Sequence, residues 1–335
     1  MRWSPNDGNI ARVFGQLSCP RAMFAYIVRR ILSTVPVMAV VALFVFCLLH
    51  LTPGDPAAII AGDTASPADI ARIHQALGLD RPLYVQFATW VWQLLHGDLG
   101  VSIFTNLPVT TLIGQRVGPT LALAIPTLVV SVLAAIPMGV LAAWRAGSWI
   151  DRGVMAFAVL GFSVPVFVLA YVLIYLFAVR TAWLPVQGFV GPDHGLWPFL
   201  SHLLMPTLAL AMVYSALIAR MTRASMLDVL AQDYIRTARA KGLGSGDVLI
   251  RHALKNAAVP IVTIIGLGIA SLVAGVVVTE TVFAIPGLGR LTVDSILRRD
   301  YPIIQGVILI FSGIYVLINL LVDLSYTLLD PRIRY

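Results

Sequence analysis

Residues 256–279 read NAAVPIVTIIGLGIASLVAGVVVT, which is 24 residues in a row without Asp, Glu, Lys or Arg. A helix needs about 20 such residues to cross the hydrocarbon core of a bilayer. Five further charge-free stretches of similar length occur in the chain, the first at residues 31–54. The sequence therefore predicts six transmembrane helices, near residues 27–50, 119–143, 154–179, 203–220, 259–279 and 303–327.

The composition agrees with a chain that is mostly embedded in lipid. Charged residues make up 12% of it and apolar residues 59%, whereas soluble domains carry about 25% charged residues. The net charge of +7 does not indicate nucleic-acid binding, because the basic residues lie between the apolar runs instead of forming one patch. These features predict an all-α integral membrane bundle in contact with the lipid bilayer.

The distribution of Lys and Arg predicts the orientation of the six helices. If the N-terminus is cytoplasmic, sixteen Lys and Arg fall in inside segments and seven in outside segments. Such a bias is the positive-inside rule, so both termini are expected in the cytoplasm. Several of the spans contain prolines, Pro165 among them, and we expect the helices to continue through them as bundled membrane helices do.

An N-terminal tail precedes the expected spans, and two longer segments, 51–117 and 220–258, lie between them. Residues 1–22 are predicted to be a polar cytoplasmic tail, with Met23 as a candidate alternative start, and residues 23–335 the transmembrane domain. The external segment 51–117 is expected to carry a helix that begins at Ser66-Pro67 and ends at Gly78, and an aromatic-rich helix at 82–96. This amphipathic pair either caps the external face or contacts the substrate directly.

The inside loop, residues 220–258, has the clearest pattern. Leu227, Leu230, Tyr234 and Ala238 are spaced three, four and four apart, which predicts one apolar stripe on a helix. Gly242 is expected to end that helix, and a second one is expected from Ser245 towards Asn256, ending before Pro260. The stripe would rest on lipid headgroups or fit a groove in a soluble partner; the residues alone leave both alternatives open.

Glu280 is the only glutamate of the chain, and it directly follows the charge-free stretch 256–279. It precedes a turn rich in aromatic, proline and glycine residues that includes Phe283, Pro286 and Gly287. A carboxylate in this position is either partly solvated at the membrane surface, or it is functional. In the second case it holds an external gate by hydrogen bonds or contacts an ammonium group of the substrate.

The sequence offers no catalytic or metal site. Neither Lys241 nor Lys255 stands in a Walker A context, and HExxH and GxSxG are absent. The six histidines and two cysteines have no ligand spacing. The chain is therefore expected to be no enzyme. A secondary transporter or channel subunit driven by an ion gradient is the alternative function, but such proteins usually carry ionisable groups in mid-membrane, which these spans lack.

The loop sequence DYIRTARAKGL, residues 233–243, resembles the cytoplasmic "EAA" loop of permease subunits of bacterial ABC importers. Arg236-Thr237-Ala238 stand where that family has Glu-Ala-Ala, and Gly242 matches its glycine. The missing glutamate and the longer gap from Gly242 to Pro260 are usual in the dipeptide/oligopeptide/nickel branch. The resemblance runs from about residue 24 to residue 335 and includes LTPGDP (51–56), LGLDRPL (77–83), GDLGVS (97–102), TETVFAIPGLG (279–289), RDYPIIQG (299–306) and DPRIRY (330–335).

This resemblance implies a type I ABC importer permease fold in the bacterial inner membrane. A second, similar permease would complete the pathway for dipeptides, oligopeptides, glutathione or nickel chelates. Two cytoplasmic ATPase subunits would bind ATP and Mg, so this chain needs no cofactor, and a periplasmic protein would deliver the substrate. The resemblance implies that the ATPase-coupling residues are Leu227, Leu230, Tyr234, Thr237, Ala238 and Gly242.

Overall fold

The computed structural model describes residues 20–51, 57, 66–77 and 80–329, and every secondary-structure element named within them is a helix. Most of the tail, the segment TPGDP after Leu51, Gly78 and the C-terminal DPRIRY lie outside these residues. The elements are α2 (Pro20–Leu51), α4 (Pro67–Leu77), α5 (Leu83–Leu95), α6 (Val109–Trp144), α7 (Trp149–Ser163), α8 (Val166–Leu173), η1 (Ile174–Arg180), η2 (Pro192–His194), α9 (Leu196–Leu230), α10 (Asp233–Ala240), α11 (Ser245–Asp247), η3 (Val248–Leu254), α12 (Lys255–Val282), α13 (Leu288–Arg298) and α14 (Tyr301–Leu329).

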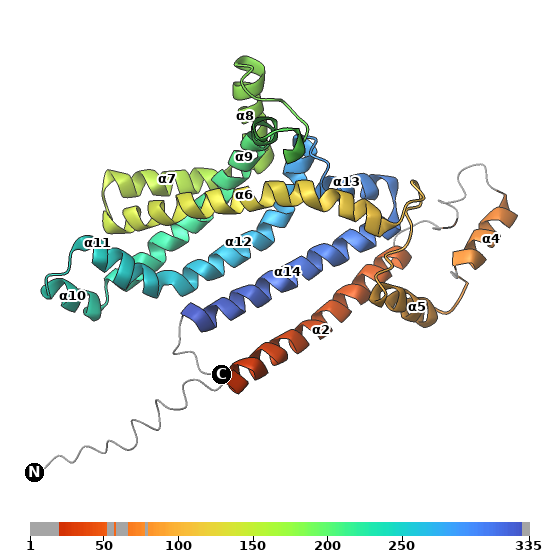
Figure 1. Ribbon diagram of the computed structural model, residues 1–335, viewed down its shortest axis with the longest axis horizontal. Helices are drawn as coiled ribbons and strands as arrows, with labels where there is room; N and C mark the ends of the chain where they lie inside the picture. The colour runs from red at the N-terminus through yellow and green to blue at the C-terminus, as the bar shows by residue number, and fades with distance from the viewer. Residues whose placement is uncertain (1–19, 52–56, 58–65, 78–79, 330–335) are drawn as a thin grey trace, which may run out of the picture.

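Five described helices are long and apolar enough to cross a membrane: α2, α6, α9, α14 and the continuous helix from α11 through α12. In Figure 1 the helices α6, α12, α14 and α2 follow one another in an elongated bundle. Contacts link α9 to α6 and α12, α12 to α14, and α14 to α2. The all-helical membrane bundle is confirmed.

The third expected span is not one straight helix. It is divided into α7 and α8–η1, which meet at an angle of 101°. Val164 between them is extended, with φ −90° and ψ 122°, because the ring of Pro165 disfavours the helical conformation in the residue before it. The structure therefore has six spans only if this bent pair counts as one, and our expectation that the helix continues through Pro165 was wrong.

The two helices that flank the inside loop 220–258 are longer than the charge-free stretches predicted. Helix α9 runs to Leu230, and α11 and η3 lead into α12 without a break. The expected end before Pro260 was wrong, since Pro260 lies inside α12. A membrane helix tolerates such a proline when its surroundings satisfy the freed carbonyl.

The two helices expected in the segment 51–117 are present as α4 and α5. Pro67 is the first residue of α4, and α5 ends one residue before His96. Helix α5 is attached to α2 by aromatic side chains, since the Phe46 ring lies 5.2 Å from Phe87 and 5.8 Å from Trp90. Helix α13 was not predicted. Its buried residues Leu288, Leu291 and Ser295 follow helical spacing. The loop-like motifs on either side of it hid this helical spacing in the sequence.

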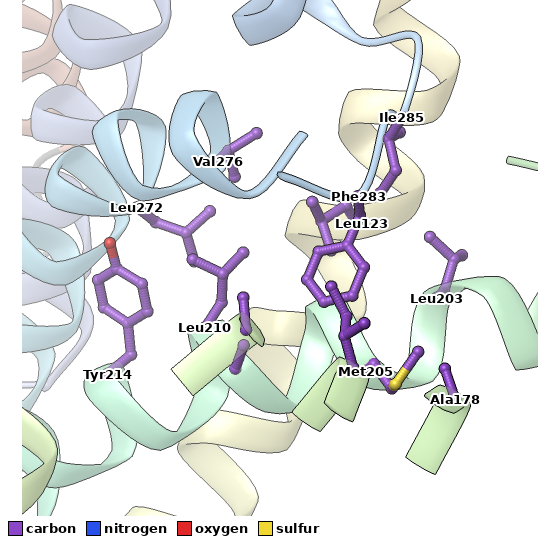
Figure 2. Close-up of a cluster of buried hydrophobic side chains, with 13 residues drawn as sticks. Leu123, Ala178, Leu203, Met205, Leu210, Tyr214, Leu272, Val276, Phe283 and Ile285 are labelled. Carbon is purple, nitrogen blue, oxygen red and sulfur yellow. The ribbon is translucent and has the colours of Figure 1, made fainter. Parts of the chain in front are cut away.

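The largest buried cluster lies where α6, α8, α9 and the end of α12 meet. Figure 2 shows the ring of Phe283 between Leu123 of α6 and Met205 of α9, with Ile285 beside Leu123. Phe283 is 1% exposed. The residues just after α12 are thus part of the apolar interior, and this anchors the turn that carries the first candidate site.

Candidate functional site

The side chain of Glu280 is fully buried and joins three helices. Its Oε1 accepts a hydrogen bond from the Thr120 hydroxyl of α6 at 2.7 Å, and its Oε2 accepts one from the Arg290 N–H of α13 at 3.0 Å. The Thr120 oxygen in turn accepts the Leu288 N–H at 2.8 Å. A buried carboxylate is stable only when donors replace its water. These donors do so, and they fix α6, α12 and α13 to one another.

The turn after Glu280 closes tightly around the same carboxylate. The Ile285 N–H donates to the Glu280 carbonyl at 2.9 Å, and Ala284 has φ +52°, which is rare for a residue with a side chain. A Cβ on Gly287 would lie 2.0 Å from Glu280 Oε1 and 2.4 Å from Oε2. Glycine is therefore required at position 287 because the carboxylate occupies the space of a side chain.

A second loop is fastened to this turn. The Gly188 N–H donates to the Phe283 carbonyl at 2.8 Å, and the Gln187 side chain donates to the Val282 carbonyl at 3.1 Å. The structure thus brings together the predicted residues Glu280, Phe283, Gly287 and the half-buried Pro286. The interpretation of Glu280 as a partly solvated surface residue was wrong, because both of its oxygens are buried and hydrogen bonded.

Another buried carboxylate joins two of the sequence motifs. Asp300, which is 2% exposed, accepts the Ser102 hydroxyl at 2.5 Å and the Ile103 N–H at 3.3 Å. GDLGVS and RDYPIIQG therefore contact each other, although 198 positions separate Ser102 from Asp300. No local pattern predicts such a contact. We call the region of Glu280, Asp300 and their donors the carboxylate end of the molecule.

The predicted loop helix is divided into two. Helix α9 ends at Leu230 and α10 begins at Asp233 after an extended Gln232 with ψ 149°. Leu227 and Leu230 therefore belong to α9, and Tyr234 and Ala238 to α10. The expectation of a single stripe on one helix was wrong, since the intervening residues Ala231 and Gln232 turn the chain. In Figure 1 α10 and α11 lie at the end of the bundle away from α13 and α5.

Helix α10 is seated on its own chain by apolar side chains. Ile235 is 0% and Ala238 7% exposed, and both belong to a cluster with Met226 of α9, Ala143 of α6 and Val248 of η3. Leu227 and Leu230 are half-buried against the same cluster. Thr237 is exposed and Tyr234 is 44% exposed. We call this cluster the α10 seat.

The end of α10 is a glycine cap. Gly242 has φ +82°, and its N–H donates to the Arg239 carbonyl at 2.9 Å while the Leu243 N–H donates to the Ala238 carbonyl at 3.3 Å. These two bonds form a Schellman motif, in which a left-handed residue closes the helix. The prediction that Gly242 supplies the turn is confirmed. The space around a Cβ at this position is open, so only the backbone conformation requires glycine.

Sequence reasoning missed Thr120, Ile235, and the pair formed by Asp151 and Arg223. Thr120 carries no signal, because one hydroxyl in an apolar run is common. Ile235 lies on a different face from the stripe that we had drawn, and the helix break hid its role. The ion pair between Asp151 and Arg223 had a signal: opposite charges beside two spans, both on the predicted inner side.

Known proteins resemble this chain over almost its whole length. It is 55% identical to a probable peptide ABC transporter permease protein, y4tP, of Sinorhizobium fredii, over 93% of this chain and 100% of the relative. It is 45% identical to the glutathione transport system permease protein GsiC of Salmonella choleraesuis and 40% identical to the dipeptide transport system permease protein DppB of Alkalihalophilus pseudofirmus, again over 93% of this chain and 100% of each relative.

A solved structure shares the fold. The inward-facing MetNI methionine ABC transporter aligns with a TM-score of 0.54 at 20% identity, covering 65% of this chain and 96% of that one. Residues 23–124 match the N-terminal family of binding-protein-dependent transport system membrane components, and residues 135–335 match the main family. The chain belongs to the family of binding-protein-dependent transport system inner membrane components.

Proposed function

We propose that this chain is the permease subunit of an ATP-driven importer for peptides or similar small solutes, including glutathione. The names of relatives that are 40–55% identical over 93% of the chain support this substrate class. A second, homologous permease would form the other half of the pathway. A periplasmic binding protein would deliver the solute to the carboxylate end.

The observation that carries the proposal is the seating of α10. One face of this helix is buried in the α10 seat, while Thr237 and Tyr234 are exposed at the end of the bundle. A short helix held in this way transmits displacement from a soluble partner to α6, α9 and α12. Two ATPase subunits would supply that displacement and would bind ATP and Mg, because the chain has no Walker A sequence.

Glu280 is proposed to hold the external turn instead of contacting the solute. Both carboxylate oxygens already accept hydrogen bonds within the chain, so an ammonium group of a substrate would have to displace them. The turn and the loop around Gly188 would act as one unit at the entrance of the pathway.

Transport driven by an ion gradient is less well supported. Coupling carboxylates of such transporters have to exchange ions or protons. Here Glu280 is fully hydrogen bonded within the chain, and Asp323 of α14 is paired with Arg30 of α2. Both acids thus have structural partners among the described residues.

Reconstitution of the full complex tests the proposal. The chain would be co-expressed with its second permease and ATPase subunits and placed in lipid vesicles with the binding protein. Uptake of glutathione or dialanine supports the importer if it requires ATP on the side of the membrane that carries the ATPase subunits. Uptake that continues without ATP and follows an imposed proton or sodium gradient would instead establish the alternative.

Cysteine labelling tests the proposed orientation. In a variant lacking Cys19 and Cys47, Asp193→Cys and Gly246→Cys would be treated in intact cells with an impermeant thiol reagent. The Asp193 side chain is 72% exposed, and Gly246 has no neighbouring atom within 4 Å of a built Cβ, so both cysteines are accessible. We expect labelling at 193 alone. Labelling at 246 alone would show that the orientation is opposite to the proposed one.

A further inference from the structure

Asp151 and Arg223 form a two-point ion pair between different helices. Asp151 lies in the first turn of α7 and is 4% exposed; Arg223 lies in α9. The guanidinium donates from Nε to Oδ1 and from Nη2 to Oδ2, the latter at 2.7 Å. The Gly147 N–H donates to the same Oδ2 at 2.9 Å. The carboxylate therefore fixes both the α6–α7 turn and α9.

The pair stands apart from most other ion pairs of the described residues. Asp193–His194, Asp233–Arg236, Asp247–Arg251 and Asp294–Arg290 each join residues at most four positions apart. Exposed pairs of that kind contribute little. Among the ion pairs between residues that the structure describes, Arg30–Asp323 and Asp151–Arg223 join distant helices, and the second has the more deeply buried acid.

The pair lies beside the α10 seat. Arg223 precedes Met226 by one helical turn, and Met226 packs with Ala143 and with Ile235 of α10. Arg223 also follows Thr222, whose Cβ would lie 2.5 Å from a Cβ built on Gly139 of α6. Close apolar contact thus already links α6 to α9 at this level. Helix α7, which leads to the bend at Pro165, is attached to the same level by the ion pair.

We propose that the Asp151–Arg223 pair makes α7 move together with α9 when α10 is displaced, and so couples ATP hydrolysis to the pathway. The residues are positioning residues, and the proposal rests on the proposed function. A bidentate guanidinium–carboxylate contact suits this role because it fixes direction as well as distance, whereas apolar helix faces slide more easily. Lysine would supply the charge without the two-point geometry.

The test compares single variants with the double variant in the full reconstituted complex. Asp151→Asn and Arg223→Gln each leave one partner without its counter-charge, whereas Asp151→Asn with Arg223→Gln removes both charges. Removing both partners of a buried pair is often neutral for stability, and removing one is not. The thermal stability of the three variants is therefore expected to depend only on whether a charge is left without its partner. The measured quantity is the ratio of ATP hydrolysis with binding protein and dialanine or glutathione to hydrolysis without them.

We expect the double variant to regain the apparent Tm and subunit content of the wild type, but to keep a stimulation ratio lowered roughly tenfold, within the usual range for coupling between sites. Arg223→Lys should give an intermediate ratio. Arg152→Gln, one residue from the pair and exposed, is the matched control and should retain the wild-type ratio.

A double variant that recovers both stability and stimulation would overturn the proposal, since the pair would then serve only to neutralise charge. A ratio lowered equally by Arg152→Gln would overturn it as well, because loss of any positive charge at this turn would explain the effect. Failure of the proposed function has a different signature: the wild-type chain itself would show no stimulation and would not retain the ATPase subunits.

Discussion

The two ends of the bundle are held together by different physical means. At the carboxylate end, buried Glu280 and Asp300 accept hydrogen bonds from side chains and backbone groups of other segments. At the other end, α10 rests on its chain through Ile235 and Ala238, which make apolar contacts in the α10 seat. Hydrogen bonds are directional, and breaking a buried one leaves an unsatisfied group. Apolar contact is non-directional.

This difference matches what each end is proposed to do. A turn fixed by directional bonds at the carboxylate end moves as a rigid unit or not at all. A helix seated by apolar contact is able to shift by small amounts while it stays buried. We therefore expect substitutions at the carboxylate end to act through lost geometry, and substitutions at the α10 seat to act through lost burial.

The largest effect is expected from Ala238→Asp. Ala238 is 7% exposed in an apolar cluster, so the new carboxylate would be buried without a partner, at a cost on the order of 3–5 kcal/mol. Helix α10 should leave its seat. We expect loss of uptake and of the ATPase subunits on purification, with a lowered apparent Tm of the isolated permease.

The resemblance of the loop implied that Ala238 contacts the ATPase, whereas the structure buries it in its own chain. Ala240→Asp separates the two explanations, because Ala240 is an exposed residue of the same helix. An unchanged Tm in Ala238→Asp, together with lost ATPase subunits, would place Ala238 in the partner interface after all.

Gly287→Ala should produce the next largest effect. Its Cβ would fall 2.0–2.4 Å from the Glu280 carboxylate, so either the turn or the carboxylate has to move, at about 3 kcal/mol as for overpacked cores. We expect uptake to fall sharply while ATPase subunits remain bound. Gly313→Ala, where a Cβ meets no atom within 4 Å, is the matched control. Equal uptake by the two variants would contradict the geometry of the turn.

Composition and charge pattern were sufficient for the membrane bundle, and Pro67 and Gly242 marked the start of α4 and the end of α10. The break at Pro165 and the division at Ala231–Gln232 were not predicted, because both depend on how neighbouring helices accept a change of direction. Glu280 was singled out as the lone glutamate. Its donors on α6 and α13 were not. Thr120 lies 160 positions from Glu280, and a contact over that separation follows from the packing of helices. The Arg290 N–H is only ten positions away, but it reaches the carboxylate because the turn after α12 folds back.

Glu280→Gln should have a moderate effect. One oxygen becomes an NH2 group that faces a donor, either the Thr120 hydroxyl or the Arg290 N–H, with a loss of about 2 kcal/mol for a buried bond to a charged group. Uptake should be impaired while assembly with the ATPase subunits is retained. Wild-type uptake at normal expression would show that the turn does not need the carboxylate.

Thr120 provides an independent check on the same network. Thr120→Val removes both the donor to Glu280 and the acceptor for the Leu288 N–H at nearly constant volume. Thr120→Ser retains the hydroxyl. We expect uptake to fall in the valine variant as it does in Glu280→Gln, and to recover in the serine variant. A serine variant as impaired as the valine variant would attribute the effect to packing of the methyl group.

The smallest effect is expected at Gly242, which sharpens the contrast between the two ends. Gly287 has an ordinary backbone conformation but no space, whereas Gly242 has open space and φ +82°. A side chain in this left-handed region costs about 1–2 kcal/mol, and asparagine tolerates the region better than most residues. Gly242→Asn should therefore reduce stimulated ATP hydrolysis slightly and Gly242→Ala more. Gly242→Val should reduce it most, because a β-branched side chain resists a positive φ. The measurement is the stimulation of ATP hydrolysis by the binding protein, which should decrease in the order Asn, Ala, Val. If alanine and valine both match the wild type, the Schellman cap of α10 is not needed for coupling.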